Sequence, residues 1–362
     1  MRKNTLARIA RVELAPPRYL AAPAAGIDIS ASGIKLAVIE EKLHGLELVA
    51  FGEERLAPGV IIGGEISNPQ VVADAIRTLT RKHRIRFANI ALSESRSYLF
   101  EAEAPGANLS EWRTSVEQHL DEYVPLPSTE VAFDIAPVKI ENAKAQVVGV
   151  GYARRVIEES LRMLDEAGIA ARAIESETFS VARALLPYGD TETVLIIDIG
   201  RTTTKLSVVG SGIPRFATTL DIGGHALTLA VQKHFSVTEE EAKRVKAEKG
   251  LVAGAGNEEY IAAMLSTVSV IRDEIVRRLD YWQTHAVAGG LHEPVTRVVL
   301  AGGNATVRGL PEYLETALKL PVELGEVFTN LASRDVWLPP IDYLESLAYA
   351  TAIGLALREH TP

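Results

Sequence analysis

The sequence predicts an α/β protein built from two related lobes. Two stretches carry this prediction: GIDISASGIKLAVIE, from Gly26 to Glu40, and LIIDIGRTTTKLSVV, from Leu195 to Val209. Each ends an apolar run on an aspartate, passes through a short polar turn, and places a lysine seven residues after the aspartate. Each stretch therefore predicts a β-hairpin. Helical patterns follow both hairpins, which indicates an internal duplication with a cleft between the lobes.

Strand and helix patterns alternate through the rest of the first half. Apolar runs and alternating patterns predict strands over 46–56, 88–95, 97–105, 130–140 and 145–153. Apolar residues at helical spacing predict helices over 68–83, 110–124 and 154–168. Asn68 caps the first helix with Pro69 in its first turn, Ser110 caps the second, which ends before Pro125, and Gly168 ends the third.

The second half repeats the plan after its hairpin. A third strand is predicted over 213–224, and a strand, a glycine turn and a helix follow one another over 296–318. Further helices are predicted over 225–235, 238–250, 260–285 and 342–360. Thr238 and Glu241 form a capping-box pattern at the start of the second of these, and Gly250 ends it.

Composition excludes several classes of protein. Hydrophobic residues make up 47% of the 362 residues and charged residues 23%, which is typical of a globular protein. The net charge of −9 argues against nucleic acid as the main partner, since phosphate binding needs a basic face. The absence of cysteine excludes disulfide bonds and fits a reducing compartment. No apolar run approaches the ~18 residues of a membrane-spanning helix.

The first 25 residues differ from the rest, because they carry five basic residues and one acidic residue. We expect a solvated tail. The alternative is a short amphipathic helix on an anionic membrane, with Leu6, Ile9 and Leu14 facing inward.

Two facing hairpins would suit a nucleotide. Tight turns expose successive backbone N–H groups, which form concavities for anions, so two of them could hold a di- or triphosphate from both sides. Asp28 and Asp198 could hold a hydrated Mg²⁺, and Lys35 could contact the terminal phosphate. The Gly302–Gly303 turn leaves room for a base or a ribose. The sequence contains neither a Walker A loop nor a G-x-G-x-x-G motif after a strand.

These motifs resemble those of the actin-like ATPase superfamily. GIDISASGIK is similar to its first phosphate loop, IDIGRTTTK to its second, VVLAGGNATVRGL to its adenosine loop, and AIESETFSVARAL to its connecting segment. Within the superfamily, the chain resembles the PilM family of type IV pilus assembly proteins over roughly residues 25–360. That resemblance rests on DEYVPLPSTEVAFDI, RFATTLDIGGHALTLAV, EEEAKRVKAEKG and AIGLALRE.

The resemblance implies the residues of an ATP site. The nucleotide-binding residues would be Asp28, Ser32, Lys35, Asp198, Gly200, Thr202, Thr203, Lys246, Gly302 and Gly303. Asp28 and Asp198 would hold Mg²⁺ through water, and Glu177 would position the attacking water. Two residues, Ser30 and Lys243, depart from the family pattern. We therefore expect ATP to act as a structural ligand, with slow hydrolysis or none.

The resemblance also implies a division of the chain into an actin-like ATPase fold with a PilM-type subdomain 1C. The expected parts are a tail at 1–25, subdomain 1A at 26–87 and 169–190, subdomain 1C at 88–168, and lobe 2 at 191–362 with subdomain 2B at about 225–290.

The function implied is that of a cytoplasmic, ATP-binding scaffold of type IV pilus assembly, recruited peripherally to the inner membrane. It would capture the N-terminal cytoplasmic peptide of a PilN-type inner-membrane protein and link it to the motor platform, with the pilus motor ATPases as further partners. The peptide would bind in the groove between subdomains 1A and 1C near Tyr123, Pro125 and Phe133, mainly through apolar contacts.

Other interpretations remain open at this point. The chain could be an FtsA-like, membrane-tethered filament protein or a small-molecule kinase of the same fold. Taken singly, Asp28 or Asp198 could be a turn residue that bonds its own backbone, and Glu177 could simply stabilise a helix N-terminus. Lys205, whose counterpart is not used in the family, is expected to be a solvated strand residue.

Overall fold

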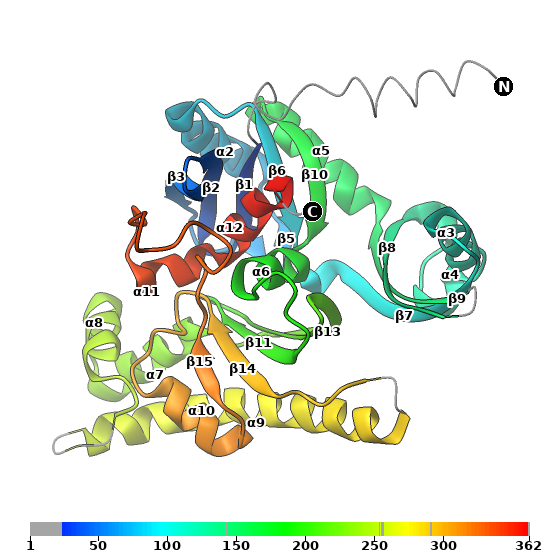
Figure 1. The fold of residues 1–362 in the computed structure, drawn as a ribbon. Helices are drawn as coiled ribbons and strands as arrows, with labels where there is room; N and C mark the ends of the chain where they lie inside the picture. The colour runs from blue at the N-terminus through cyan, green and yellow to red at the C-terminus, as the bar shows by residue number, and fades with distance from the viewer. Residues whose placement is uncertain (1–23, 142–143, 253, 255–256, 290–291, 361–362) are drawn as a thin grey trace.

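The computed structural model describes residues 24–360 except 142–143, 253, 255–256 and 290–291, so almost all of the predicted tail over 1–25 lies outside the described residues. The described chain forms two lobes, each built on a five-stranded sheet, and a smaller unit beside the first lobe (Figure 1). Within that part of the chain, we find no helix of sufficient length and apolarity to span a membrane.

The sheet of the first lobe has the strand order β10-β6-β1-β2-β3. Its strands are β1 Ala24–Ser30, β2 Gly33–Lys42, β3 Gly45–Arg55, β6 Phe87–Leu92 and β10 Ala170–Ser176. Helices α2 (Pro69–His83) and α5 (Arg154–Ala167) cover one face of this sheet. The α2 prediction is confirmed, because the Asn68 side chain accepts a hydrogen bond from the Val71 N–H and the apolar side chains of Val72, Ile76 and Leu79 are buried on one face.

The sheet of the second lobe repeats this plan with the order β13-β12-β11-β14-β15. Its strands are β11 Thr193–Ile199, β12 Thr204–Gly210, β13 Ile213–Leu220, β14 Arg297–Ala301 and β15 Val322–Leu324. The helices on its outer face are α7 Gly224–Phe235, α8 Glu239–Lys249, α9 Glu258–Gly289 and α10 Leu310–Leu318. The capping box that Thr238 and Glu241 predict at the start of α8 is present.

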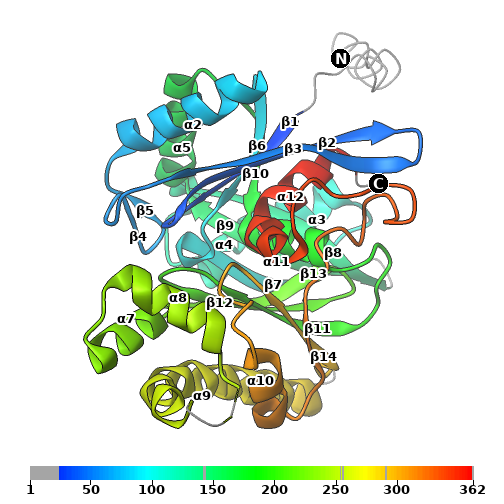
Figure 2. The same cartoon turned by 90° about the vertical axis from the view of Figure 1, so that its left-hand side faces the viewer.

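A layer of two helices lies between the sheets. These helices are α6 (Glu177–Leu185) and α12 (Ala350–Leu357), which contact each other closely. Figure 1 labels both helices, and Figure 2 shows α12 between the two sheets. One hydrophobic core joins them to Ile39 of the first sheet and Ile196 of the second. Residues 342–360 were expected to belong to lobe 2. Helix α12 of this segment instead packs directly on β1 and β2 of the first lobe. Both lobes therefore share this central core.

The smaller unit has its own sheet and core. Strands β7 (Ser97–Pro105), β9 (Lys144–Ala153) and β8 (Val131–Glu141) pair in the order β7-β9-β8, and α3 (Leu109–Gln118) and α4 (Leu120–Tyr123) pack against them. The predicted subdomain 1C, 88–168, is too wide for this unit. It includes β6, which is hydrogen-bonded between β1 and β10, and α5, which packs on α2.

Two local predictions also need correction. The helix predicted from Ser110 begins at Leu109, because Asn108 is the cap and accepts hydrogen bonds from the N–H groups of Ser110 and Glu111, and it is interrupted at His119. The helix predicted over 342–360 is divided into α11, η4, α12 and η5, at Tyr343–Ser346, Leu347–Tyr349, Ala350–Leu357 and Arg358–His360. The remaining short elements are β4 Ile61–Ile62, β5 Glu65–Ile66, η2 Glu94–Arg96 and η3 Ser128–Glu130.

Candidate functional site

A cavity of about 680 Å³ lies between the two lobes. The turns of both hairpins, the glycine turn after β14, η2 and the start of α6 contribute to its walls. All but one of the predicted nucleotide and catalytic residues line this cavity: Asp28, Ser32, Lys35, Glu177, Asp198, Gly200, Thr202, Thr203, Gly302 and Gly303. The exception is Lys246.

The two hairpins present equivalent pairs of charges to the cavity. Asp28 on β1 lies directly opposite Lys35 on β2, and Asp198 on β11 lies directly opposite Lys205 on β12. Side chains that face each other across two antiparallel strands are close neighbours. The spacing of seven residues in the sequence therefore corresponds to one cross-strand pair in each lobe.

Burial dominates the electrostatics of the two aspartates. It raises the pKa of Asp28 from 3.8 to about 6, against the opposing effects of Lys35 and Lys205. Burial likewise raises the pKa of Asp198, although Lys205 counteracts it. The two carboxylates thus lie in a poorly solvated place where a cation would favour their charged forms.

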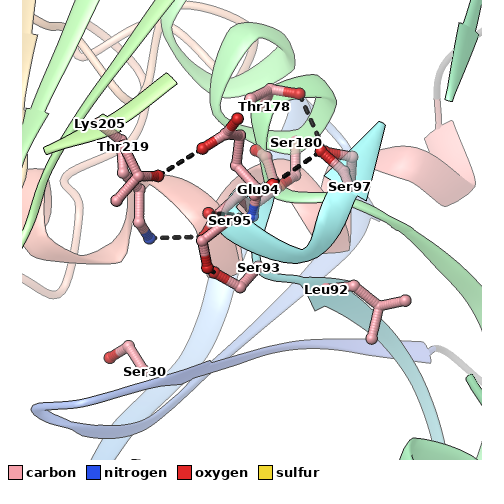
Figure 3. Close-up of polar contacts among 12 residues, drawn as sticks. Ser30, Leu92, Ser93, Glu94, Ser95, Ser97, Thr178, Ser180, Lys205 and Thr219 are labelled. Carbon is pink, nitrogen blue, oxygen red and sulfur yellow. Dashed lines mark hydrogen bonds and ion pairs between the residues drawn. The ribbon is translucent and has the colours of Figure 1, made fainter. Parts of the chain in front are cut away.

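Glu177 is held from two sides. Its Oε2 atom lies 2.6 Å from Lys205 Nζ, and its Oε1 atom accepts a hydrogen bond of 2.7 Å from the Glu94 N–H. The Glu94 carboxylate in turn accepts a hydrogen bond from the Thr219 hydroxyl of β13, as Figure 3 shows. This network joins η2 and α6 of the first lobe to β12 and β13 of the second.

The expectation that Lys205 is a solvated strand residue is wrong. Its side chain is 22% exposed and lines the cavity. Burial alone would lower the pKa of Lys205, but the carboxylates of Glu177, Asp198 and Asp28 outweigh burial and raise it. The repeat in the sequence could have predicted that Lys205 lines the cavity, because Lys205 occupies the position equivalent to Lys35. No comparable sequence signal pointed to Glu94 or Thr219.

The glycine turn approaches the second hairpin closely. Gly302 has φ +86°, and a Cβ atom built on it would lie 2.3 Å from Asp198 Oδ1. Any side chain here would displace the Asp198 carboxylate, so glycine at this position is required by both the backbone conformation and the packing.

Lys246 lies behind this turn and does not line the cavity. Its Nζ atom donates to the Gly224 carbonyl at 3.0 Å and to Asn304 Oδ1 at 2.9 Å. Burial lowers its pKa to about 8, and the positive charge of Lys243 contributes. Lys243 itself lies on the surface of α8, where it pairs with Glu239 and Glu240.

The donor groups fit a magnesium ion that also binds phosphate. Among the described residues, neither the Asp28 nor the Asp198 carboxylate has a hydrogen-bonding partner or an ion pair within 4.0 Å. The described chain contains no group of three or more acidic or histidine side chains arranged to hold a metal. Mg²⁺ commonly takes only one or two carboxylates and completes its shell with water and phosphate oxygens, which suits this pair.

A second cavity, of about 510 Å³, lies where the chain passes between the first lobe and the smaller unit. Its lining consists of 95–98 at the start of β7, Leu126, Thr129 and Glu130 before β8, and 153–156 at the start of α5. It contains Arg96, Arg154 and Arg155 and is therefore less apolar than expected.

Tyr123, Pro125 and Phe133 do not line this second cavity. The Tyr123 ring stacks on Phe100 with 4.8 Å between centroids, and the Phe133 ring lies under the Arg113 guanidinium at 4.6 Å. From the segment between Tyr123 and Phe133, the residues that line the cavity are Leu126, Thr129 and Glu130.

Comparisons with known proteins match nearly the whole chain. The sequence model of the family described as type IV pilus assembly protein PilM matches residues 26–360. A chain in the structure titled PilM-PilN type IV pilus biogenesis complex superposes with a TM-score of 0.77 and 23% identity, over 96% of this chain and 100% of that chain.

Two further likenesses are more distant. MreB5 of Spiroplasma citri bound to ADP superposes with a TM-score of 0.56 and 13% identity, over 94% of this chain and 99% of that chain. Cell division protein FtsA of Borreliella burgdorferi is 21% identical over 256 residues, which are 65% of this chain and 59% of that protein. Together these likenesses confirm the actin-like ATPase fold.

Proposed function

Because the chain belongs to the PilM family of type IV pilus assembly proteins, as its motifs predicted, we propose that it is an ATP-binding scaffold that captures a peptide of an inner-membrane partner. One observation carries the nucleotide part. Two equivalent Asp–Lys pairs, Asp28 with Lys35 and Asp198 with Lys205, line a single cavity between the lobes.

In this proposal the two hairpin turns hold the phosphates. Backbone N–H groups of both turns and the Lys35 ammonium bind phosphate oxygens, and the backbone of Gly302 and Gly303 accommodates the nucleoside. Asp28 and Asp198 would hold Mg²⁺ through water. The ion would neutralise part of the charge on the phosphate oxygens.

We expect ATP to be hydrolysed slowly or not at all. A residue that orients or deprotonates water needs a carboxylate oxygen within reach of that water. Both oxygens of Glu177 are engaged, one by the Lys205 ammonium and the other by the Glu94 N–H. This arrangement supports a structural role for the nucleotide.

The second cavity is our proposed site for the N-terminal peptide of a PilN-type protein. The solved relative in the PilM-PilN complex has this fold, which supports such a partner here. Tyr98, Leu126 and Val156 offer apolar contacts, whereas Arg154 and Arg155 offer positive charge. We therefore expect binding to weaken with added salt, unlike binding in a purely apolar groove.

Capture of such a peptide would recruit the protein peripherally to the cytoplasmic face of the inner membrane. The pilus motor ATPases are the further partners that we propose, because a scaffold bound to the membrane complex could link it to the motor platform. This link rests on family membership alone.

Calorimetry with ATP and Mg²⁺ tests the nucleotide site. Asp198→Ala should abolish Mg²⁺-dependent ATP binding and leave the fold intact, whereas Asp221→Ala, an exposed aspartate after β13, should bind like the wild type. An unchanged affinity in Asp198→Ala would exclude this site.

Fluorescence anisotropy with a labelled PilN-type N-terminal peptide tests the second cavity. Arg155→Glu reverses a charge on the cavity wall and should weaken binding at least about tenfold. Arg81→Glu makes the same change on the exposed end of α2 and should have no effect. Equal affinities for both variants would place the peptide elsewhere.

A further inference from the structure

A run of basic residues joins the end of α2 to the start of β6. The sequence RKHRIR occupies residues 81–86, and no acidic residue occurs from 75 to 93. Four side chains of this run are exposed and take part in no ion pair with any described residue: Arg81, Lys82, Arg84 and Arg86. We call these four residues the basic strip. Their positive charges face the solvent without acidic partners.

The basic strip lies at the end of the first lobe where the described chain begins. Ala24, the first described residue, pairs with Phe87 of β6, which directly follows the strip. On the other side of β6, the Ala170 N–H of β10 donates to the Arg86 carbonyl at 2.9 Å. The beginnings of β1, β6 and β10 and the last turn of α2 therefore share one end of this lobe (Figure 1).

Residues 1–23 bring further positive charge to this end, because they are joined to Ala24. They contain five basic residues and one acidic residue, although the whole chain has a net charge of −9. Acidic residues at the same end offset part of the charge of the strip: Glu40 and Glu41 in β2, and Asp165 and Glu166 in α5. The strip and residues 1–23 together make this end of the lobe positive.

We propose that this end of the first lobe binds the surface of an anionic lipid membrane, with the basic strip and residues 1–23 against the headgroups. Each Lys or Arg near an anionic membrane surface strengthens binding about fivefold. Neither of the two cavities described above includes a residue of the strip, so exposed side chains rather than a pocket make the contact. The inference adds a direct lipid contact to the recruitment by a peptide and does not depend on it.

Helix α5 leads from the second cavity to this end of the lobe. It begins with Arg154 and Arg155 in the cavity wall and ends at Ala167, close to the strip. Its 14 residues span about 21 Å. A partner that leaves the membrane as an extended chain covers this distance with about seven residues. Lipid contact and peptide binding can therefore occur together, and each raises the effective concentration of the other.

Vesicle flotation with the purified full-length protein tests the inference. One set of vesicles consists of phosphatidylcholine alone, and the other of phosphatidylcholine and phosphatidylglycerol in equal parts. The wild type should float with the phosphatidylglycerol vesicles and not with the neutral ones. Added salt should release it, because it screens charges at an exposed surface.

Charge reversal in the strip is the decisive variant. Arg81→Glu/Arg86→Glu should lower affinity for phosphatidylglycerol vesicles at least about tenfold. Lys233→Glu/Arg244→Glu is the matched control, because it changes the net charge equally at two exposed positions of α7 and α8 that have no ion pair with a described residue. This control should bind like the wild type.

A second pair of changes tests residues 1–23 in the full-length chain. Arg8→Glu/Arg11→Glu should also weaken binding to phosphatidylglycerol vesicles at least about tenfold. Circular dichroism and thermal melting establish that each variant is folded. Should Arg81→Glu/Arg86→Glu unfold, Arg81→Gln/Arg86→Gln takes its place and should weaken binding less strongly, because it removes charge without reversing it.

Three results would overturn the inference. The first is equal binding of the wild type and the folded strip variant, even if Arg8→Glu/Arg11→Glu binds weakly, since residues 1–23 would then act alone. The second is equal binding of the wild type to neutral and anionic vesicles. The third is tighter binding of a labelled DNA duplex through the same residues, which would assign the strip to nucleic acid. The assay contains neither ATP nor a peptide, so the nucleotide and peptide sites are tested separately.

Discussion

Lys246 of α8 and Asn304 of the glycine turn are joined by a hydrogen bond of 2.9 Å between Nζ and Oδ1. Asn304 Nδ2 donates in turn to the Gly200 carbonyl at 2.9 Å, in the turn of the second hairpin. One amide side chain therefore connects a surface helix to a wall of the cavity. Lys246 has a second link to this wall, because it also donates to the Gly224 carbonyl and the Gly224 N–H donates to the Gly200 carbonyl at 3.0 Å.

The first prediction concerns this amide. Asn304→Ala should weaken ATP binding about tenfold, because the Gly200 turn loses a hydrogen bond worth about 1 kcal/mol and Lys246 loses one of its two acceptors. Asn330→Ala is the control, since Asn330 Nδ2 donates to the carbonyls of Arg183 and Leu186 but does not line the cavity. The prediction fails if calorimetry gives both variants the same affinity.

The second prediction concerns pH. Because the pKa of Asp28 is raised to about 6 in the folded protein, the folded state binds a proton more tightly than the unfolded state. The stability from this proton is complete below about pH 4 and is lost as pH rises through 6. Raising the pKa of Asp28 from 3.8 to about 6 costs the ionised folded state about 3 kcal/mol. Asp28→Asn should therefore be more stable than the wild type at pH 7.

Urea unfolding at pH 7, 6 and 5, in EDTA and without nucleotide, measures this effect. The advantage of Asp28→Asn in the free energy of unfolding should shrink as the pH falls. Asp221→Asn, at an exposed position, should match the wild type at every pH. A constant difference between Asp28→Asn and wild type would contradict the assigned cause.

The third prediction concerns the contact between the smaller unit and the second lobe. Glu101 of β7 pairs with Arg215 of β13 and, at 2.8 Å, with His292 Nε2. The Arg215 side chain is only 11% exposed, so Glu101→Ala would leave a largely buried charge without its partner. We expect a loss of about 1–3 kcal/mol in the free energy of unfolding.

Glu103 provides the control on the same strand. It pairs with Lys144, and both side chains are about 60% exposed, so Glu103→Ala should change stability by less than about 0.5 kcal/mol. Hydrogen exchange should also increase at β7 and β13 in Glu101→Ala alone. An equal loss in the free energy of unfolding for the two variants would show that the Glu101–Arg215 pair adds no stability.

The fourth prediction concerns Gly354 in α12. Replacing a helical glycine with alanine normally stabilises a helix by up to about 1 kcal/mol. Here the added Cβ would lie 1.7 Å from the Ser180 carbonyl oxygen of α6. Gly354→Ala should therefore destabilise the protein by at least about 2 kcal/mol in urea unfolding. Gly254→Ala, where no residue of the described chain comes within 4 Å of the added Cβ, should be nearly neutral.

The sequence patterns predicted the features that depend only on the pairing of neighbouring residues along the chain. An alternating strand with a fixed turn places Asp28 opposite Lys35 and Asp198 opposite Lys205, so both hairpins and their charged pairs could be read directly. Capping was harder, because Asn108 and Ser110 both suit an N-cap, and only the backbone conformation decides between them.

Contacts between distant segments could not be predicted in this way. Glu94 reaches Glu177 through its backbone N–H, which carries no residue-specific signal. Lys246 was expected in the nucleotide site, yet Asn304 holds it outside the cavity. The boundaries of the smaller unit were also missed, because β6 and α5 are joined to the first lobe by sheet pairing and helix packing.

The position of α12 has a consequence for how the chain reaches its native state. This helix packs on β1, where Gly26 lies so close that a Cβ would be 2.0 Å from the Ala352 carbonyl oxygen. On the ribosome, β1 is made early and α12 only after nearly all the other elements. Until then, one apolar face of the first sheet stays uncovered, and chaperones that bind apolar segments have their longest access to it.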